Sequence, residues 1–407
     1  MYPSRAGGLA SKSDNPFPHA RGIASSMSCN RVSPPRVLID LEKLRHINCG
    51  LGRFSLHLGE GILADFRDRI EPVFLMPQSA RPRFTERELG TVAVRPWRKE
   101  FVQRWVRPIA KPFLGRPPYA VWHMTNQMSR YEPLDPRVPV LLTVHDLTFL
   151  HKASQDRRMR EIERKRADTQ RRVDRAAAIA VDSQFVADDL RRELTIGGRP
   201  IHVIPLGLAA TPPASSVRPA FLASDRPFLL SVGNALAHKN FHVLIDMIEL
   251  LPDHMLVIAG SMQGEYGDFL RRQVSRRRLD GTVVLPGEVS DGDRQWLYER
   301  CAAFLFPSLS EGFGLPVLEA MQAGRPVFVS RLTSLPEIAG EHGFPFDSFV
   351  PQAMVAALAA GMARFAAEPW RVAAQRAHAA TFTWQETVRR YVELYEAIAM
   401  SAGGVAA

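Results

Sequence analysis

The sequence has very few cysteines and no long apolar run. Its 407 residues include three cysteines, which lie far apart, form no CxxC pair and have no histidine paired nearby. Their scarcity argues against a disulfide framework and against a structural zinc site, and it favours a reducing compartment. No stretch of about 18 apolar residues occurs, so the sequence predicts no membrane-spanning helix. The cysteines are Cys29, Cys49 and Cys301.

The N-terminus also lacks an apolar signal segment. Residues 1–26 contain no hydrophobic core of the kind that a secretory signal needs, so we expect a cytoplasmic protein. Residues 1–35 are rich in serine, proline, glycine and arginine, and this composition predicts a disordered extension. Met27 is an alternative start of the chain.

Acidic residues are outnumbered by basic ones. The 52 lysines and arginines exceed the 42 aspartates and glutamates and give a formal net charge of +10. A basic surface attracts nucleotides, nucleic acids or anionic membranes. Nucleic acid is the least favoured of these partners, because the sequence has no aromatic–basic RNA-binding motif.

Short apolar runs alternate with helical segments along most of the chain. Many of these runs are rich in valine, isoleucine and leucine without a polar alternation, which is typical of buried parallel strands. The pattern predicts an α/β protein with two Rossmann-like, doubly wound parallel sheets that face a cleft. The expected strands are 36–41, 71–76, 91–96, 119–124, 138–146, 176–183 and 201–206, and then 227–233, 254–260, 282–287, 302–308 and 326–330.

A change in composition separates the two series of strands. The segment 206–226 is rich in proline, alanine and serine and shows no periodic pattern, so we predict a linker there. The predicted organisation is an extension (1–35), a first Rossmann-like domain (36–205), the linker (206–226), a second Rossmann-like domain (227–382) and a C-terminal helix (383–400) that packs back on the first domain.

The segment Ser310–Val327, SEGFGLPVLEAMQAGRPV, follows an expected strand and enters a helix. Ligands bind at the carboxyl ends of strands in such sheets, and a helix N-terminus offers free N–H groups to phosphates and sugar oxygens. A carboxylate such as Glu319 can accept hydrogen bonds from a pair of ribose hydroxyls, while Glu311 faces the reacting end of an extended ligand. The spacing of Glu311 and Glu319, taken alone, also fits an ordinary turn followed by a helix with a surface glutamate.

Further candidates lie at the ends of other expected strands. Gly233 and Asn234 end the first strand of the second series, and Lys239 beside this turn suits a diphosphate. His145 ends a strand of the first series. The alternative for Lys239 is an ordinary basic residue at the start of a helix. The alternative for His145 is a hydrogen-bonded histidine that caps the next turn.

Taken together, these segments resemble the retaining glycosyltransferases of family 4. The resemblance runs from about Val37 to Ala399 and is carried by GLGRFSLHL, TVHDLTFLH, AVDSQFVADDL, SVGNALAHKN and SEGFGLPVLEAMQAG. It implies the GT-B fold and the transfer of a sugar from a nucleotide diphosphate sugar to an acceptor, with retention at the anomeric carbon. It also implies that neither a metal ion nor a cofactor is needed, because basic side chains and helix ends stabilise the charge.

The resemblance assigns roles residue by residue. His145 contacts the transferring sugar through its side chain or backbone, Glu311 lies near the donor sugar, and Lys239 neutralises the leaving diphosphate. Glu319 holds the ribose. The expected catalytic residues are therefore His145 and Glu311, and the expected donor-binding residues are Gly50, Gly52, Gly233, Asn234, His238, Lys239, Gly312, Phe313, Gly314, Leu315 and Glu319.

Two positions depart from the family pattern. Many members carry basic residues where this chain has Asn234 and His238, so one positive charge is missing unless His238 is protonated. Two alternatives to a transferase therefore stay open. One is a catalytically weak, donor-binding partner subunit, and the other is a nucleotide-sugar 2-epimerase on the same fold.

The acid pair Asp291–Asp293 resembles the metal motif of the other glycosyltransferase fold only superficially. With Ser290 before it, we expect this segment to begin a helix as a capping box. For the reaction, we expect the acceptor hydroxyl to attack from the face that the phosphate leaves, with the phosphate taking the proton. A covalent intermediate on Glu311 is the less favoured route.

The segment Arg95–Arg116 places aromatic residues at four-residue spacing among basic ones. Such a stripe suits an anionic membrane surface, and a helix packed on the first domain is the alternative. With a membrane partner, we expect a peripheral enzyme on the inner face of the membrane. Its acceptor would be a glycan or a lipid-linked chain in lipopolysaccharide or other surface polysaccharide synthesis.

Overall fold

The computed structural model describes residues 33–47, 49–84, 89–95, 105, 106, 109, 115, 117–151 and 156–403. The predicted disordered extension therefore lies almost wholly outside the described residues, and so does most of the aromatic–basic stripe at 95–116. Within that stripe Trp105, Val106 and Ile109 are described, and all three are exposed. No helix among the described residues is both long enough and apolar enough to cross a bilayer.

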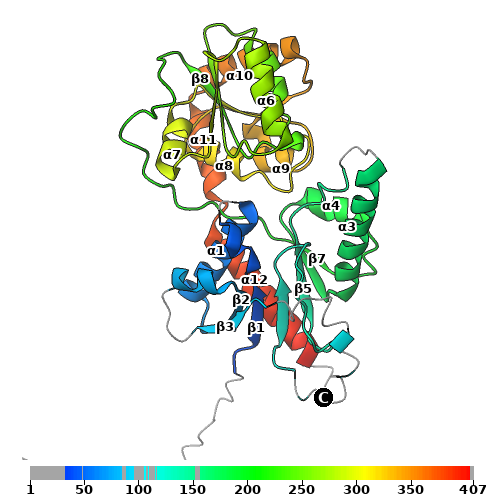
Figure 1. Ribbon diagram of the computed structural model, residues 1–407. Coiled ribbons are helices and arrows are strands. Elements are labelled where there is room, and N and C mark those ends of the chain that lie inside the picture. Colours follow the sequence, from blue (N-terminus) through cyan, green and yellow to red (C-terminus); the bar gives the residue numbers. More distant parts are fainter. Residues whose placement is uncertain are drawn as a thin grey trace, which may run out of the picture. The chain divides into compact units, whose positions relative to one another are not determined.

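The described residues form two parallel sheets (Figure 1). The first sheet has seven strands in the order β3-β2-β1-β4-β5-β6-β7, and the second has six in the order β10-β9-β8-β11-β12-β13. This confirms the prediction of two doubly wound α/β sheets. The strands of the first sheet are β1 (Arg36–Asp40), β2 (Glu71–Met76), β3 (Gly90–Ala93), β4 (Val121–Met124), β5 (Val140–Val144), β6 (Ala178–Val181) and β7 (Ile201–Val203). Those of the second are β8 (Phe228–Val232), β9 (Met255–Ala259), β10 (Val283–Gly287), β11 (Ala303–Phe306), β12 (Val327–Ser330) and β13 (Phe344–Phe346).

Helices cover both faces of each sheet. Alternate residues of the second sheet pack against α5, α6 and α10 on one face and against α7, α8 and α9 on the other. The first sheet is covered by α1 and α12 on one face and by α3 and α4 on the other. The helices are α1 (Gly50–Asp65), α3 (Asp156–Arg175), α4 (Gln184–Glu193), α5 (His242–Ile248), α6 (Glu265–Arg276), α7 (Asp291–Arg300), α8 (Leu315–Gln322), α9 (Leu335–Ala339), α10 (Pro351–Ala367), α11 (Trp370–Ala380) and α12 (Trp384–Gly403). Short 3-10 helices are η1 (Glu42–His46), η2 (Gln78–Arg83), η5 (Ala237–Lys239) and η6 (Gly340–His342).

Strand order reverses direction at one place in each sheet. In the first sheet β1 lies between β2 and β4, and in the second sheet β8 lies between β9 and β11. In the second sheet α5, which follows β8, and α8, which follows β11, pack on opposite faces of the sheet. Ligands of doubly wound proteins bind at such a switch point. The segments after β8 and β11 lie at the switch point of the second sheet, and they carry most of the predicted site residues.

The C-terminal helix α12 follows the second series of elements but packs on the first sheet. Two buried polar side chains of that sheet face it: the His123 Nδ1 lies 2.8 Å from the Tyr395 hydroxyl, and the Thr143 Oγ1 lies 3.1 Å from the Tyr391 hydroxyl. The other ring nitrogen of His123, Nε2, lies 2.8 Å from the Thr143 Oγ1. Arg69 forms an ion pair with Glu396 at its edge. The linker runs beside the start of α12, where the Leu208 N–H donates to the Phe382 carbonyl at 2.8 Å. The predicted domain boundaries themselves stay a prediction.

Burial of His123 makes stability depend on pH. Burial, and to a smaller degree His145, lowers the pKa of His123 to about 3, whereas an unfolded histidine titrates near 6.5. Below about pH 6.5 the unfolded chain takes up a proton that the folded chain does not. The free energy of unfolding should therefore fall with decreasing pH, by up to about 1.4 kcal/mol per pH unit from this group.

The measurement is urea unfolding at pH 7.5, 6.5 and 5.5 for the wild type and for His123→Gln. The variant should show a flatter pH dependence, because its side chain does not titrate. His46→Gln is the control, since His46 is exposed. An unchanged slope in His123→Gln would contradict the assignment.

Candidate functional site

The two predicted motifs of the second sheet meet at its switch point. The Nζ of Lys239, in η5 after β8, lies 2.7 Å from the Oε1 of Glu311, in the loop after β11. The Ser308 hydroxyl donates to the same Glu311 oxygen at 2.6 Å. Both ion-pair partners are largely buried, with 14% and 12% of their side chains exposed. A charge-assisted pair at this depth fixes both side chains, and it joins residues 72 positions apart in sequence.

The backbone holds this pair in place. The carbonyl of His238 accepts a hydrogen bond from the Leu309 N–H at 2.7 Å, and its oxygen lies 3.0 Å from the Ser308 Oγ. On the other side of the loop the Glu311 N–H donates to the Thr333 Oγ1 at 3.1 Å. Thr333 has a φ of 59°, a conformation that a β-branched residue adopts only under constraint. Backbone strain of this kind is concentrated at binding sites.

Glycines shape the start of α8. Gly314 is its N-cap with a φ of 121°, a conformation open to glycine and strained for other residues. Gly312 approaches the first sheet so closely that a Cβ on it would lie 1.8 Å from the His145 carbonyl oxygen. Phe313 is buried and packs against Phe382, and Leu315 begins the helix. Only the backbone of Phe313 is therefore available to a ligand.

Glu319, the second acid of the motif, lies away from the first. Its Oε2 accepts a hydrogen bond of 2.7 Å from the hydroxyl of Tyr298, a buried residue of α7. Sequence reasoning missed Tyr298, although it is the one tyrosine on the helix that precedes the site-bearing strand.

Both ring nitrogens of His145 are engaged. Its Nε2 lies 2.9 Å from the Thr125 carbonyl, which can only accept, and its Nδ1 lies 2.7 Å from the Asp182 carboxylate. Burial opposes the charged ring, but Asp182 and the Thr125 carbonyl outweigh burial and raise the pKa of His145 above its ordinary value. Of the two predicted modes of sugar contact, the side chain is thus committed to the fold, and the carbonyl is the group that faces Gly312. Sequence reasoning missed Asp182 as its partner.

Gly50 and Gly52, the two predicted glycines at the start of α1, differ in the space around them. A Cβ on Gly52 would lie 2.1 Å from the His46 carbonyl oxygen, so this glycine is needed for the contact between α1 and η1. A Cβ on Gly50 would meet nothing within 4 Å, and its backbone is open to a ligand. In the second sheet the carbonyl of Gly233 packs on Gly260, where a Cβ would lie 2.2 Å away.

Asn234 does not replace the arginine that many family members have near this place. Its Oδ1 accepts a hydrogen bond of 3.2 Å from the Ser261 N–H, in the loop after β9. The side chain therefore ties together two loops at the carboxyl edge of the sheet. It contributes no charge.

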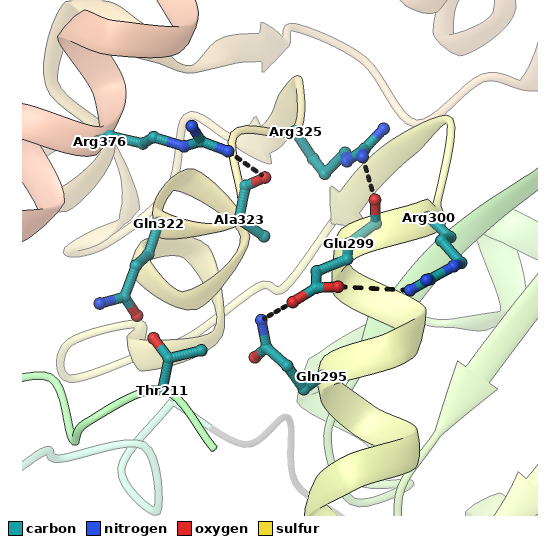
Figure 2. Close-up of a pocket in the computed structure, with 8 residues that line it drawn as sticks. All are labelled: Thr211, Gln295, Glu299, Arg300, Gln322, Ala323, Arg325 and Arg376. Carbon is teal, nitrogen blue, oxygen red and sulfur yellow. Dashed lines mark hydrogen bonds and ion pairs between the residues drawn. The ribbon is translucent and has the colours of Figure 1, made fainter. Parts of the chain in front are cut away.

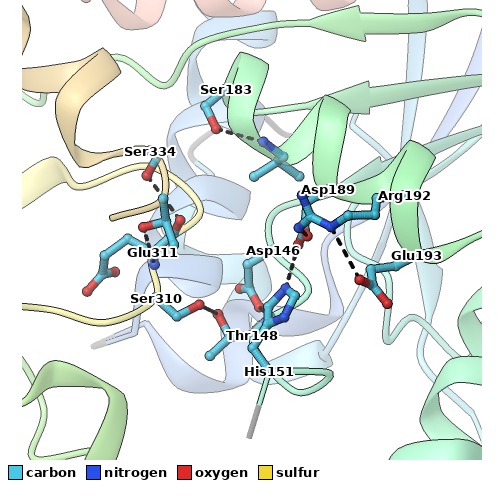
Figure 3. Close-up of polar contacts among 12 residues, drawn as sticks. Asp146, Thr148, His151, Ser183, Asp189, Arg192, Glu193, Ser310, Glu311 and Ser334 are labelled. Atoms are coloured by element: carbon cyan, nitrogen blue, oxygen red, sulfur yellow. Dashed lines mark hydrogen bonds and ion pairs between the residues drawn. The ribbon is translucent and has the colours of Figure 1, made fainter. Parts of the chain in front are cut away.

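Polar contacts around Ser310 are drawn in Figure 3. The Ser310 and Thr148 hydroxyls lie 3.1 Å apart, and the Ser334 hydroxyl donates to the Glu311 carbonyl at 3.0 Å. Nearby, His151, Asp189 and Glu193 offer ligand atoms within 4.8 Å of one another, a spacing that could hold a metal ion. Arg192, however, already forms ion pairs with both of these carboxylates.

The acid pair near the start of α7 begins a helix, as predicted. The Ser290 hydroxyl accepts a hydrogen bond of 3.0 Å from the Asp293 N–H, which is the N-cap arrangement. The Asp293 Oδ1 instead accepts from the Ser215 hydroxyl at 2.7 Å. Asp291 forms an ion pair with Arg294 at 2.9 Å.

A surface pocket of about 520 Å³ lies apart from these residues (Figure 2). It opens where α7 and α8 end, and none of the predicted site residues lines it. Its arginines cap helix ends: Arg325 donates to the Glu299 carbonyl and Arg376 donates to the Ala323 carbonyl. The lining residues are Thr211, Gln295, Glu299, Arg300, Gln322, Ala323, Arg325 and Arg376.

Comparison with known proteins finds a family match in the second half of the chain. Residues 216–380 match the family model "Glycosyl transferases group 1". "O-antigen chain mannosyltransferase B" of Escherichia coli is 33% identical over 177 residues, which cover 42% of this chain and 45% of that protein. The match therefore spans less than half the length of this relative.

Solved structures resemble nearly the whole chain. Sucrose-phosphate synthase from Thermosynechococcus elongatus superimposes with a TM-score of 0.68 at 18% identity, covering 90% of this chain and 100% of that one. Anabaena HepE in complex with UDP and glucose superimposes with a TM-score of 0.63 at 16% identity, covering 89% and 99%. The two sheets thus have the GT-B fold that the sequence resemblance implied.

The backbone of Gly314 gives a direct test of the loop before α8. Gly314→Ala should lower the free energy of unfolding by about 1–3 kcal/mol, because alanine is strained at a φ of 121°. The measurement is urea unfolding. Gly281→Ala is the matched control, since no atom lies within 4 Å of a Cβ there and its φ is not in the left-handed region. Equal stabilities of the two variants would contradict the strained geometry.

Proposed function

We propose that this chain is a retaining glycosyltransferase, a proposal supported by the match of residues 216–380 to the group 1 glycosyltransferase family model. It moves a hexose-type sugar from a nucleotide diphosphate sugar to a growing glycan or a lipid-linked acceptor. The observation that carries the proposal is the buried Lys239–Glu311 pair beside the N-terminus of α8. A cation, a helix end and an acid at one switch point can bind a diphosphate and the attached sugar together.

Each group then has one task. Lys239 and the N–H groups of Gly312 to Leu315, at the start of α8, neutralise the diphosphate, while Glu311 accepts hydrogen bonds from sugar hydroxyls. Glu319 holds the ribose, and the His145 carbonyl contacts the sugar from the first sheet. The remaining predicted donor-binding residues, Gly50, Gly52, Gly233, Asn234 and His238, shape the surrounding backbone.

The transfer proceeds on one face of the sugar. The acceptor oxygen forms its bond to the anomeric carbon as the bond from that carbon to the phosphate oxygen breaks, and the hydroxyl proton passes to the departing diphosphate. Negative charge develops on the diphosphate, where Lys239 and the helix end stabilise it. The proposal assigns this charge stabilisation to groups of the protein and requires no metal ion or cofactor.

The similarity to an O-antigen mannosyltransferase supports a role in surface polysaccharide synthesis. Mannose is accordingly the first sugar to test. The exposed Trp105 and Ile109 support contact of the 95–116 segment with an anionic membrane, and such contact would place the enzyme at the cytoplasmic face beside a lipid-linked acceptor.

The first experiment is a calorimetric screen of the protein against UDP, GDP, ADP, dTDP and CMP, with and without EDTA. We expect one nucleoside diphosphate to bind, indifferent to EDTA, and its sugar conjugate to be consumed. Product analysis then separates transfer to an acceptor from slow hydrolysis and from epimerisation of the sugar. Binding without any turnover would support the partner-subunit alternative, and binding of none of the nucleotides would refute the proposed donor site.

The ion pair makes a second, less intuitive prediction. Without donor, Glu311 forms an ion pair with Lys239, so a diphosphate must displace the Glu311 carboxylate from the lysine. Glu311→Gln should bind the nucleoside diphosphate about tenfold to a hundredfold more tightly, because a charge-assisted hydrogen bond worth about 1.5–3 kcal/mol no longer competes for the lysine. The same variant should transfer sugar far more slowly.

Lys239→Ala should instead weaken diphosphate binding by about tenfold to a hundredfold. Isothermal titration calorimetry of the three proteins measures both effects. Glu337→Gln serves as the control, because Glu337 caps the start of α4 at the Gln184 N–H and lies outside the ion pair. Weaker binding by Glu311→Gln would show that Glu311 does not compete with the ligand.

A further inference from the structure

Building on the proposed function, we propose that Tyr298 is a positioning residue for the ribose. Its hydroxyl fixes the carboxylate of Glu319 and thereby sets the preference of the site for ribonucleotides over 2′-deoxyribonucleotides. The hydrogen bond between them is 2.7 Å long and joins α7 to α8. Tyr298 itself touches no substrate in this assignment and acts through Glu319.

The tyrosine ring is held rigidly. It is 1% exposed and lies 5.6 Å from the ring of Phe304, on the strand that leads into the site. Its neighbours Trp296 and Leu297 on α7 are buried as well. A ring packed on all sides keeps its hydroxyl at one point in space, so the atom that Glu319 contacts does not move.

One oxygen of the Glu319 carboxylate, Oε2, is held by the Tyr298 hydroxyl. Glu319 is only partly buried, and among the described residues its Oε1 has no hydrogen-bond partner. The last side-chain torsion of a glutamate is otherwise broad, and a ligand would have to restrict it on binding. The hydrogen bond from Tyr298 restricts this torsion before the ligand binds. Each carboxylate oxygen keeps an unused lone pair, which is what a pair of vicinal hydroxyls requires.

The phenol also stays a donor over the whole working range of pH. Burial first, and then the nearby Glu319 charge, raises the pKa of Tyr298 well above its ordinary value. A tyrosine that merely needed a partner for its own buried hydroxyl would show the same hydrogen bond. The test therefore needs a readout that a structural role leaves unchanged, and the ratio of ribose to deoxyribose affinity is such a readout.

The experiment compares Tyr298→Phe with the wild type. The probes are the nucleoside diphosphate that the wild type binds best and its counterpart that differs only at the 2′ position, both titrated calorimetrically. We expect the wild type to prefer the ribonucleotide and Tyr298→Phe to lower this preference about threefold to tenfold. In a Glu319→Ala background, which removes the preference, Tyr298→Phe should change nothing further.

Two further variants keep the result interpretable. Tyr395→Phe removes an equally buried hydroxyl, bonded to His123 on the first sheet, and should leave the ratio unchanged. Glu319→Asp draws the carboxylate away from Tyr298 by one methylene and should lower the ratio even if Tyr298→Phe does not fold. An unchanged ratio in folded Tyr298→Phe or in Glu319→Asp would overturn the inference while the proposed function stands. Failure of the wild type to bind any diphosphate would overturn both.

Discussion

The candidate site depends on one ion pair, between Lys239 and Glu311. A lysine and a glutamate with so little solvent exposure are stable only if they are paired and their remaining hydrogen-bonding groups are satisfied. The Ser308 hydroxyl completes the shell of Glu311, and the His238 carbonyl ties η5 to the loop after β11. Parallel strands make this possible, because β8 and β11 are neighbours and end at the same edge of the sheet. Without that order, residues 72 positions apart would not meet.

The first sheet is subject to a different constraint, because it holds buried histidines inside an apolar layer. His123 on β4 and His145 after β5 each use both ring nitrogens, and their partners come from neighbouring strands and from α12. An unpaired nitrogen at this depth would cost about 1–3 kcal/mol. The C-terminal helix is therefore more than a cover for apolar residues. Tyr395 supplies a hydrogen bond that the sheet itself does not offer to His123.

Sequence reasoning located the sheets well because many buried parallel strands are uninterrupted apolar runs, such as 255–259 and 303–306. It missed β13, whose three residues Phe344–Phe346 include a proline and are too short to form a pattern. It placed Glu311 and Lys239 at the right edge, since strand ends are visible in sequence. It could not show that Gly52 serves a contact within the fold, because that depends on the distance to the His46 carbonyl. Nor could spacing reveal that Tyr298 holds Glu319 from another helix.

One departure from the expected pattern, Asn234, acquires a physical meaning in the fold. The Asn234 side chain accepts a hydrogen bond from the Ser261 N–H, so a neutral link between two loops stands where the family resemblance implies a positive charge. In the proposed complex Lys239 would then face a diphosphate with Glu311 still close by, and the local charge would be negative. Backbone N–H groups at the start of α8 must carry more of the stabilisation, and they can do so only if Gly314 keeps its left-handed conformation. A glycine that looks like a simple helix cap thus contributes to the electrostatics of the proposed site, because its conformation sets where the first N–H groups of α8 lie.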